Sequence, residues 1–322
     1  MDIRAKKIFK WTGVVVLTPF LLIILLAILL YVPPVQNWAV KKVASYASEK
    51  TGMNITVDHV NLVFPLDLGV DGLRVIQQND SLPQVKDTVA DVKNLVVNVQ
   101  LMPLFHKQVE IDALEFNRMN LNTTNFVHKA RGRGIVGKLS LKSHGIDINK
   151  QFVKVNNADI ADARLQVELS DTVPPDTTPN KNFWKIYVSK LNISNTDVTV
   201  HMPGDTLQVE AYMGSTKAHN GYFDLYKGLY QVSSLDWNHG RLKYDNNFKT
   251  FTKGLDYNHI ALSDINIGID SLYYLSPKLN LKMRACSFKE KSGIEVNEFT
   301  GPISLDSTKV FLPALRFRTP DS

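Results

Sequence analysis

The segment Gly132–Lys138 has the residue types and spacing that come nearest to a nucleotide-binding motif in this chain. Its glycines match the dinucleotide fingerprint and most of a phosphate-binding loop. However, Leu139 stands where the phosphate-binding loop needs a Ser or Thr for the metal ion. The residues that follow alternate as in a strand, whereas both motifs open a helix whose free amides hold the phosphate. We therefore interpret this segment as a glycine-rich turn and predict no nucleotide cofactor.

The other residues that could do chemistry are isolated from one another. The eight histidines show no i,i+4 pairing and no Cys or Glu at metal-ligand spacing, and the lone Cys286 can form neither an intrachain disulfide nor a cysteine-ligated zinc site. There is no G-x-S-x-G elbow, although a triad assembled from distant residues stays an alternative. Four aspartates are interpreted as turn or solvent-face residues and not as paired carboxylates: Asp67, Asp71, Asp159 and Asp162. We predict no enzyme, with no catalytic residue, no metal and no cofactor.

The composition is that of an ordinary globular chain. The 322 residues are 44% hydrophobic and 21% charged, which provides enough apolar surface to fold. The net charge is +6, of which the first ten residues supply +3 through four basic residues and one aspartate. The remaining basic and acidic groups are mixed along the chain without a basic stripe that could neutralise phosphates. We therefore exclude nucleic acid as a partner.

An uncharged apolar run at 13–32 is long enough to cross a hydrocarbon core of about 30 Å as a helix. Its apolar residues include Val14, Leu22, Leu26 and Leu30. We predict a transmembrane anchor here; a cleaved signal peptide is the alternative, but the run is longer than an ordinary signal-peptide core and no small-x-small site follows it. Basic residues precede the run, so the positive-inside rule predicts a cytoplasmic tail at 1–12 and places the rest across the membrane.

Residues 33–52 are predicted to form a short amphipathic helix. Pro33 and Pro34 favour a helix start, apolar residues then recur at helical spacing, and Gly52 is a typical C-terminal stop. Such a helix either packs on the structure that follows it or closes the membrane-proximal end of that structure.

Beyond Met53 the dominant pattern has a period of two, which predicts β-strands. In Leu95–Leu101 alternate residues share an apolar face, whereas Asn98 and Gln100 point the other way. The same alternation recurs at 164–169, 197–202, 265–270, 279–284 and 315–318. One-sided strands are typical of antiparallel sheets, because parallel strands covered on both faces read as continuous apolar runs.

The alternating positions predict a continuous apolar lining. We expect it to include Leu95, Val97, Val99, Leu101, Val167, Leu169, Val198, Val200, Ile267, Ile269, Leu281 and Met283. Prolines and polar turn residues at 171–182 predict a linker or loop between a first β segment at 53–170 and a second at 183–322. A weak internal similarity between 109–116 and 184–193 favours an extended array over a closed fold.

Three stretches of the chain resemble the AsmA-like superfamily, most closely the N-terminal part of the TamB proteins of Gram-negative bacteria. The first is Thr51–Leu68, where a helix exit leads into a strand and a Phe-Pro turn. The second is Leu95–Asp112, with Met-Pro-Leu at the strand turn. The third is Lys289–Gly301, continued by Leu315–Ser322. With the anchor, these stretches cover most of the chain.

The resemblance implies a mainly β fold, in which a transmembrane helix and a short amphipathic helix precede an elongated, curled antiparallel β-sheet. In the family this sheet forms an open hydrophobic groove of the β-taco, or repeating β-groove, type. The resemblance further implies a single-pass protein of the cell inner membrane, with its body in the periplasm, that transports phospholipid between the inner and outer membranes. Family members are usually longer and end in a conserved C-terminal domain. We therefore expect an N-terminal portion that continues beyond residue 322, or a short relative.

Phospholipid and the inner membrane are thus the expected partners. TamB is also linked to outer-membrane protein assembly, so the alternative is an assembly factor that adds strands to its clients. Such a factor would work with a TamA- or BamA-type barrel through a C-terminal region. A third alternative is a membrane-tethered β-sandwich whose apolar faces pack on each other. The alternatives differ in what meets the sheet: lipid tails, a client strand or a second sheet.

Overall fold

The computed structural model describes residues 41, 44–45, 48–49, 53–63, 67–78, 82, 84–99, 111–123, 130–147, 152–169, 185–202, 206–224, 227–246, 250 and 254–320. The predicted tail at 1–12, the anchor at 13–32 and the linker at 171–182 lie outside these residues. Within the described part of the chain, no helix has both the length and the apolar character needed to cross a membrane. The described residues of the predicted amphipathic helix have helical backbone, and the Ser48 hydroxyl accepts a hydrogen bond from the Ile55 amide at 3.0 Å.

Seventeen strands are found among the described residues, and all belong to one sheet. They are β1 Asn54–Thr56, β2 His59–Val63, β3 Asp67–Gln78, β4 Lys86–Val99, β5 Ile111–Asn122, β6 Ala130–Asp147, β7 Phe152–Leu169, β8 Lys185–Met202, β9 Leu207–Asp224, β10 Leu229–Val232, β11 Ser234–Asp245, β12 His259–Leu275, β13 Lys278–Glu290, β14 Glu295–Val296, β15 Glu298–Leu305, β16 Val310–Phe311 and β17 Arg316–Arg318. The predicted mainly β fold is confirmed.

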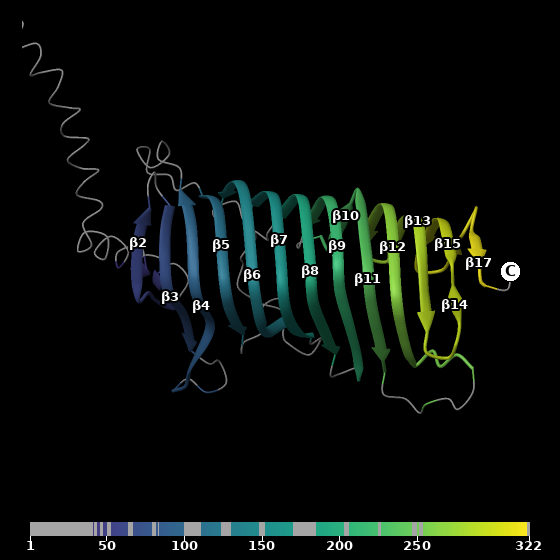
Figure 1. Ribbon diagram of the computed structural model, residues 1–322, viewed down its shortest axis with the longest axis horizontal. Coiled ribbons are helices and arrows are strands. Elements are labelled where there is room, and N and C mark those ends of the chain that lie inside the picture. Colours follow the sequence, from purple (N-terminus) through teal and green to yellow (C-terminus); the bar gives the residue numbers. More distant parts are fainter. Residues whose placement is uncertain are drawn as a thin grey trace, which may run out of the picture.

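The order of the strands in the sheet follows the chain. Each strand from β2 to β9 pairs with the next, and the series continues through β11, β12, β13 and β15. The short strand β10 shares with β11 the position between β9 and β12. Figure 1 shows the strands side by side along the long axis, from β2 at one end to β17 at the other. Strands of both predicted β segments therefore lie in one continuous sheet.

The pair β7 and β8 is parallel, so the prediction of an antiparallel sheet was wrong at this position. Phe152 pairs with Lys185, and Glu168 with His201. Fifteen residues, 170–184, separate the two strands, and a parallel pair needs a connection of about a dozen residues or more. The alternation of apolar residues could not reveal this, because it has the same period whichever way a strand runs.

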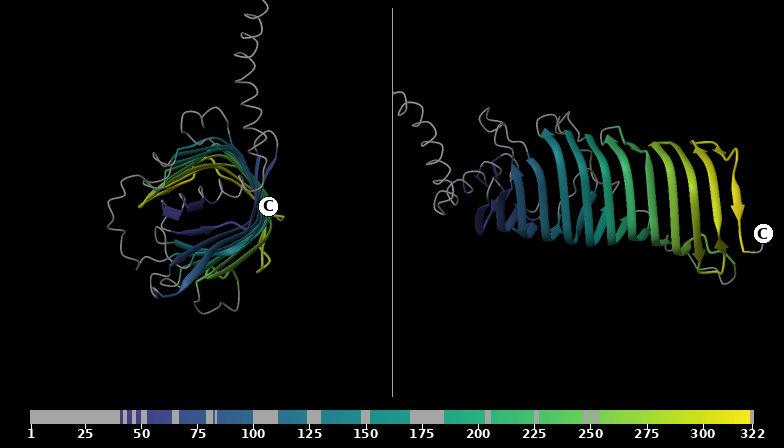
Figure 2. Two further views of the ribbon diagram at one scale, coloured as in Figure 1. Left: turned by 90° about the vertical axis from the view of Figure 1, so that its left-hand side faces the viewer. Right: turned by 45° about the horizontal axis from the view of Figure 1, so that its top comes forward.

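The long strands of the sheet are themselves strongly bent. The strands β6 to β9 have 18 residues each and, if straight, would each be about 59 Å long. The end-on view in Figure 2 shows that they instead follow an arc that is open on one side. The curvature brings the two ends of each long strand toward the same side of the molecule.

A line of left-handed residues crosses the sheet where it bends. These residues are Arg118, Asp162, Asn195, His239 and Asp264, with φ values between 44° and 56°. Asp162 and Asn195 are opposite each other on β7 and β8, and the Asn195 amide donates a hydrogen bond to the Asp162 carboxylate. Asn and Asp tolerate this backbone conformation better than other residues with a Cβ. The polar residues that interrupt the strands therefore determine where the sheet bends.

Gly137 lies opposite Asp162 on this line, within β6. A Cβ atom at Gly137 would lie 2.8 Å from the Cβ atom of Asp162, so the close approach of the two strands requires glycine. The whole segment Gly132–Lys138 lies inside β6, and its prediction as a turn was wrong. A glycine in a strand makes room for a neighbouring backbone. This close approach explains the glycine at position 137, and binding of a phosphate is not needed to explain it.

Side chains beside the line of left-handed residues are deeply buried on one face. The exposed fraction is 2% for Val92, 5% for Val136, 1% for Ala163, 2% for Thr196 and 1% for Ile265. Val136, Ala163 and Thr196 are direct neighbours in register. The described strands form one sheet, so these buried side chains are covered by the concave side of that sheet itself. We therefore assign them to the inside of the bend. We call this side of the sheet the inner face and the opposite side the outer face.

Candidate functional site

The inner face is apolar from β4 to β13. One row of neighbours in register consists of Val97, Leu114, Leu141, Ala158, Leu191, Ala218, Leu235, Ile269 and Met283. The adjacent row consists of Leu95, Phe116, Leu139, Ile160, Ile193, Thr216, Trp237, Ile267 and Cys286. Thr216 is the one hydroxyl-bearing residue in these two rows. The apolar surface therefore extends across nine neighbouring strands.

The apolar face continues onto the parts of the strands that we call the first arm. This arm runs from the line of left-handed residues to the strand ends at Leu169, Met202 and Asp245. Its inner rows are Leu165, Val198, Ala211, Leu242 and Leu262, and then Val167, Val200, Val209, Tyr244 and Ile260. All ten of these side chains are half-buried and none is buried. Such exposure is typical of a surface and differs from that of a closed core.

The predicted lining residues that the structure describes come together on this face. Eight of the twelve fall in the rows just given: Leu95, Val97, Val167, Val198, Val200, Ile267, Ile269 and Met283. Leu169 and Leu281 are two residues from Val167 and Met283 on the same strands, so they share the inner face. The side chain of Val99 and all of Leu101 lie outside what the structure describes.

Sequence reasoning missed the inner-face residues of β5, β6, β9 and β11. In β11 the inner residues Trp237 and Leu242 are five positions apart, because His239 and Gly240 form an irregularity between them. A strict period of two therefore assigns the two halves of this strand to opposite faces. A change of phase around an Asn, Asp, His or Gly residue is the signal that could have found them.

The outer face of the same strands is polar. One row in register is Glu115, Ser140, Asp159, Asn192, Lys217 and Asp236. The Asn192 amide donates a hydrogen bond to Asp159 at 2.7 Å, and Arg284 forms ion pairs with Asp236 and Asp270. Three of the four aspartates that the sequence offered as carboxylates accept hydrogen bonds from asparagine side chains: Asp71 from Asn94, Asp159 from Asn192 and Asp162 from Asn195. From β5 to β11 the two faces therefore differ in chemistry.

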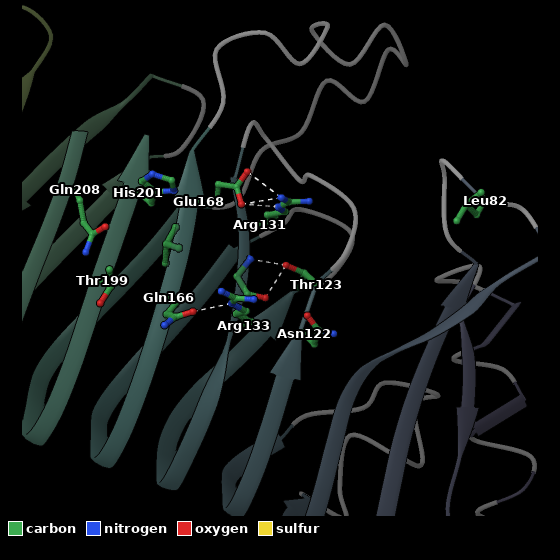
Figure 3. A pocket seen from close by; sticks show the side chains of 12 residues that line it. Leu82, Asn122, Thr123, Arg131, Arg133, Gln166, Glu168, Thr199, His201 and Gln208 are labelled. Carbon is green, nitrogen blue, oxygen red and sulfur yellow. Dashed lines mark hydrogen bonds and ion pairs between the residues drawn. The ribbon is translucent and has the colours of Figure 1, made fainter. Parts of the chain in front are cut away.

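A polar cavity of about 690 Å³ lies near the end of the first arm. Arg131 donates to Glu168 at 2.7 Å, and the Arg133 Nε atom donates to the Gln166 side chain at 2.6 Å. Figure 3 shows these pairs on neighbouring strands, with Thr199, His201 and Gln208 farther along the sheet and Leu82 across from them. The polar side chains of β6 and β7 hydrogen-bond to one another across the two strands. Cross-strand pairing therefore explains the polar lining of this cavity.

The described residues include no group of three or more His, Cys, Asp or Glu side chains placed to hold a metal ion. Cys286 is buried in the inner row on β13. Burial raises the pKa of its thiol, which keeps the sulfur neutral and a poor nucleophile. The feature with a clear chemical capacity is therefore the apolar inner face, which can remove hydrocarbon from water.

Comparison with known sequences identifies no relative. Neither a protein-family model nor a curated protein matches this chain. The relationship to the AsmA-like superfamily therefore stays a proposal.

Proposed function

We propose that this chain is an AsmA- and TamB-like lipid conduit, anchored in the inner membrane with its body in the periplasm. In this proposal the inner face is the lining of an open hydrophobic groove, and the acyl chains of phospholipids lie along it on their way between the two membranes. The observation that carries the proposal is the pair of apolar rows that crosses nine strands on the inside of the bend.

The physical basis of the proposal is the transfer of hydrocarbon from water to this face. Burial of apolar surface contributes about 25 cal/mol per Å², or roughly 0.8 kcal/mol per methylene. The term has no preferred direction, so a chain can slide from one row to the next without a change in chemistry. Between β4 and β13 the rows extend over eight strand spacings, which is about 38 Å.

The half-buried state of the first-arm residues supports an open groove over a closed core. In a β-sandwich a second sheet would cover Val167, Val200 and their neighbours. The described strands form one sheet, and these side chains keep part of their surface exposed. We therefore do not retain the sandwich as an explanation of the described part of the chain.

An assembly factor that adds strands to its clients is a second candidate, favoured by the edge at β16 and β17. Val310, Phe311 and Phe317 are 64%, 63% and 55% exposed. In the described residues β17 pairs with β15 alone, so its other side has free backbone groups. If strand addition is the function, Phe317→Pro should abolish the binding of an unfolded outer-membrane protein and leave phospholipid binding unchanged.

The lipid conduit is tested by moving a charge from one face to the other. Val167 and Val200 are neighbours on the inner face, and Gln166 and Thr199 are neighbours one residue away on the outer face. We expect the full chain carrying Val167→Asp and Val200→Asp to lose at least about tenfold of its co-purifying phospholipid, because charge opposes the burial of hydrocarbon. The matched variant with Gln166→Asp and Thr199→Asp should keep it.

Mass spectrometry of extracted lipid measures this difference, and circular dichroism shows whether each variant is folded. Equal retention of phospholipid by the two folded double variants would contradict the proposal. Wild-type protein without any lipid, even after incubation with phospholipid micelles, would contradict it as well.

A further inference from the structure

The inner face ends in an aromatic row on the side of the bend opposite to the first arm. We call this side the second arm; it contains the N-terminal part of β8, the C-terminal part of β9 and the whole of β10. Its outermost inner row is Ile186, Phe223, Tyr230, Tyr274, Leu279, Leu305 and Val310. The ring centroids are 6.2 Å apart for Phe223 and Tyr230, and 6.0 Å apart for Tyr230 and Tyr274.

Tyr230 and Tyr274 mark a boundary between apolar and aqueous surroundings. Their exposed fractions are 36% and 37%, so each ring is partly covered and partly in water. A tyrosine combines an apolar ring with a polar hydroxyl, which suits a position where one end is apolar and the other is wet. The hydrocarbon of a lipid bound on the inner face would meet water at this row.

Four lysines lie beside the aromatic row, and we call them the lysine rim. They are Lys185, Lys227, Lys278 and Lys309, and all four are exposed. Lys185, Lys278 and Lys309 directly precede members of the row, and Lys227 lies in the turn between Phe223 and Tyr230. Alternation along a strand places the first three on the outer side, so their long side chains reach the edge of the inner face around the strand ends. The rim extends from β8 to the turn after β15, which is about 24 Å at the usual strand spacing.

The acidic residues beside the lysine rim hold the turns of the backbone. Asp224 accepts a hydrogen bond from the Lys227 amide at 3.0 Å, and Asp306 accepts hydrogen bonds from the amides of Thr308 at 2.9 Å and Lys309 at 3.0 Å. Among the described residues, no carboxylate forms an ion pair with an ammonium group of the rim. The charge of Lys278 also acts on the Asp306 carboxylate, but all four ammonium groups lie beyond ion-pair distance of an acid among the described residues and offer positive charge to a ligand.

The first arm differs from the second in this respect. Arg131 pairs with Glu168 at 2.7 Å, Lys243 with Glu210 at 3.4 Å, and Lys289 with Glu295 at 3.6 Å. These three basic groups are paired with acids on neighbouring strands, whereas Arg164 and Arg241 of the same arm are exposed, and Arg241 lies over the Tyr212 ring at 4.4 Å. On the second arm the four exposed lysines have no ion pair among the described residues, and they adjoin aromatic rings on three neighbouring strands, β9, β10 and β12.

We propose that the lysine rim binds the phosphate of a phospholipid headgroup while the acyl chains of the same molecule lie on the inner face. This inference rests on the proposed lipid conduit and adds to it the side on which the headgroup travels. Lysine provides a mobile point charge that suits phosphate. Several lysines at intervals along the rim allow the phosphate to pass from one to the next as the acyl chains slide.

The test compares lipids that differ in the phosphate and share the same acyl chains. Full-length protein is incubated with dodecyl maltoside micelles that contain equal amounts of phosphatidylglycerol and diacylglycerol, and the bound lipids are measured by mass spectrometry. The rim variant carries K185Q, K227Q, K278Q and K309Q. The control carries K138Q, K142Q, K190Q and K217Q, which remove four exposed lysines from the outer face and change the net charge equally.

We expect wild-type and control protein to bind phosphatidylglycerol about fivefold better than diacylglycerol, and the rim variant to bind the two lipids equally. The rim is overturned if its variant keeps the preference, if the control loses it to the same extent, or if wild-type protein has none. Each of these results leaves the lipid conduit intact when both lipids are bound. Wild-type protein that binds neither lipid overturns the conduit, and the rim with it.

Discussion

On β7 and β8, a shift of one residue separates Val167 and Val200 from Gln166 and Thr199. The first pair lies on the inner face among aliphatic neighbours, and the second lies on the outer face in register with Arg133 and Glu210. Both pairs share the same backbone, the same strand order and the same bend. The difference shows that the chemistry of a residue here depends on the face to which alternation along its strand assigns it. Its place within the sheet does not decide this.

Because of the bend, the two faces differ in shape as well as in chemistry. In a flat sheet the two faces would be equally accessible, whereas the bend shields one of them. Ala163, next to the left-handed Asp162, is 1% exposed on the inside of the bend. Changes at the bend should therefore have the largest effect on stability, and changes at the ends of the rows a smaller one.

Gly137→Val is expected to have the largest effect on stability. The new Cβ atom would lie 2.8 Å from the Asp162 Cβ atom, and both strands would have to move apart at the bend. Overpacking of this kind costs about 1–3 kcal/mol. The measurement is the free energy of unfolding from urea titration, monitored by circular dichroism.

Gly132→Val is the matched control on the same strand. A Cβ atom at Gly132 has its nearest neighbour at 3.7 Å, the carbonyl oxygen of Gln166, which is an ordinary contact. We expect the control to unfold at nearly the same urea concentration as the wild-type protein. Equal destabilisation by the two substitutions would show that the bend does not depend on Gly137.

Glu290 tests how the inner side of the sheet accommodates a charge, because it is a buried carboxylate in register with the inner-face residue Leu262. Desolvation by burial raises its pKa, but hydrogen bonds from Ser292 and from the Ala261 amide, with the charge of Lys291, outweigh this effect. The pKa of Glu290 therefore lies below its ordinary value. A carboxylate with a lowered pKa stabilises the fold above its unfolded-state pKa, and this stability is lost as the pH falls through its folded-state pKa.

Glu290→Gln should remove this pH dependence, with a smaller effect than the substitution at Gly137. Between about pH 5 and pH 3, the free energy of unfolding should fall more steeply for the wild-type protein than for the variant. Thermal unfolding at several pH values measures the two slopes. Parallel slopes would mean that the hydrogen bonds to Glu290 do not favour its ionised form.

The sequence was sufficient to predict strands and their apolar faces, because both follow from the alternation of side chains across a strand. Leu95 and Val97, or Ile267 and Ile269, needed no knowledge of their partners. The parallel pair of β7 and β8 could not be predicted, since it depends on where the chain goes between Leu169 and Lys185. Long-range pairing of this kind leaves no local pattern.

The bend was hidden for a different reason. Asp162, Asn195 and His239 look like ordinary solvent-face residues, and each has a left-handed backbone only in the context of its neighbouring strands. Gly137 was interpreted as part of a turn, because a glycine-rich segment usually indicates one. Only the register reveals that these residues lie on one line. The lysine rim was missed likewise, because its members are up to 124 positions apart in the chain, from Lys185 to Lys309.

The most direct test of the account is to ask which face touches the acyl chains. Leu191 and Asn192 are adjacent on β8, with Leu191 in the inner row and Asn192 in the outer polar row. A photoreactive benzoylphenylalanine is placed at one position or the other, and the full chain is irradiated with a phospholipid that carries a tag on its acyl chain. We expect lipid adducts at position 191 and only background at position 192. Equal labelling at the two positions, or labelling at 192 alone, would contradict it.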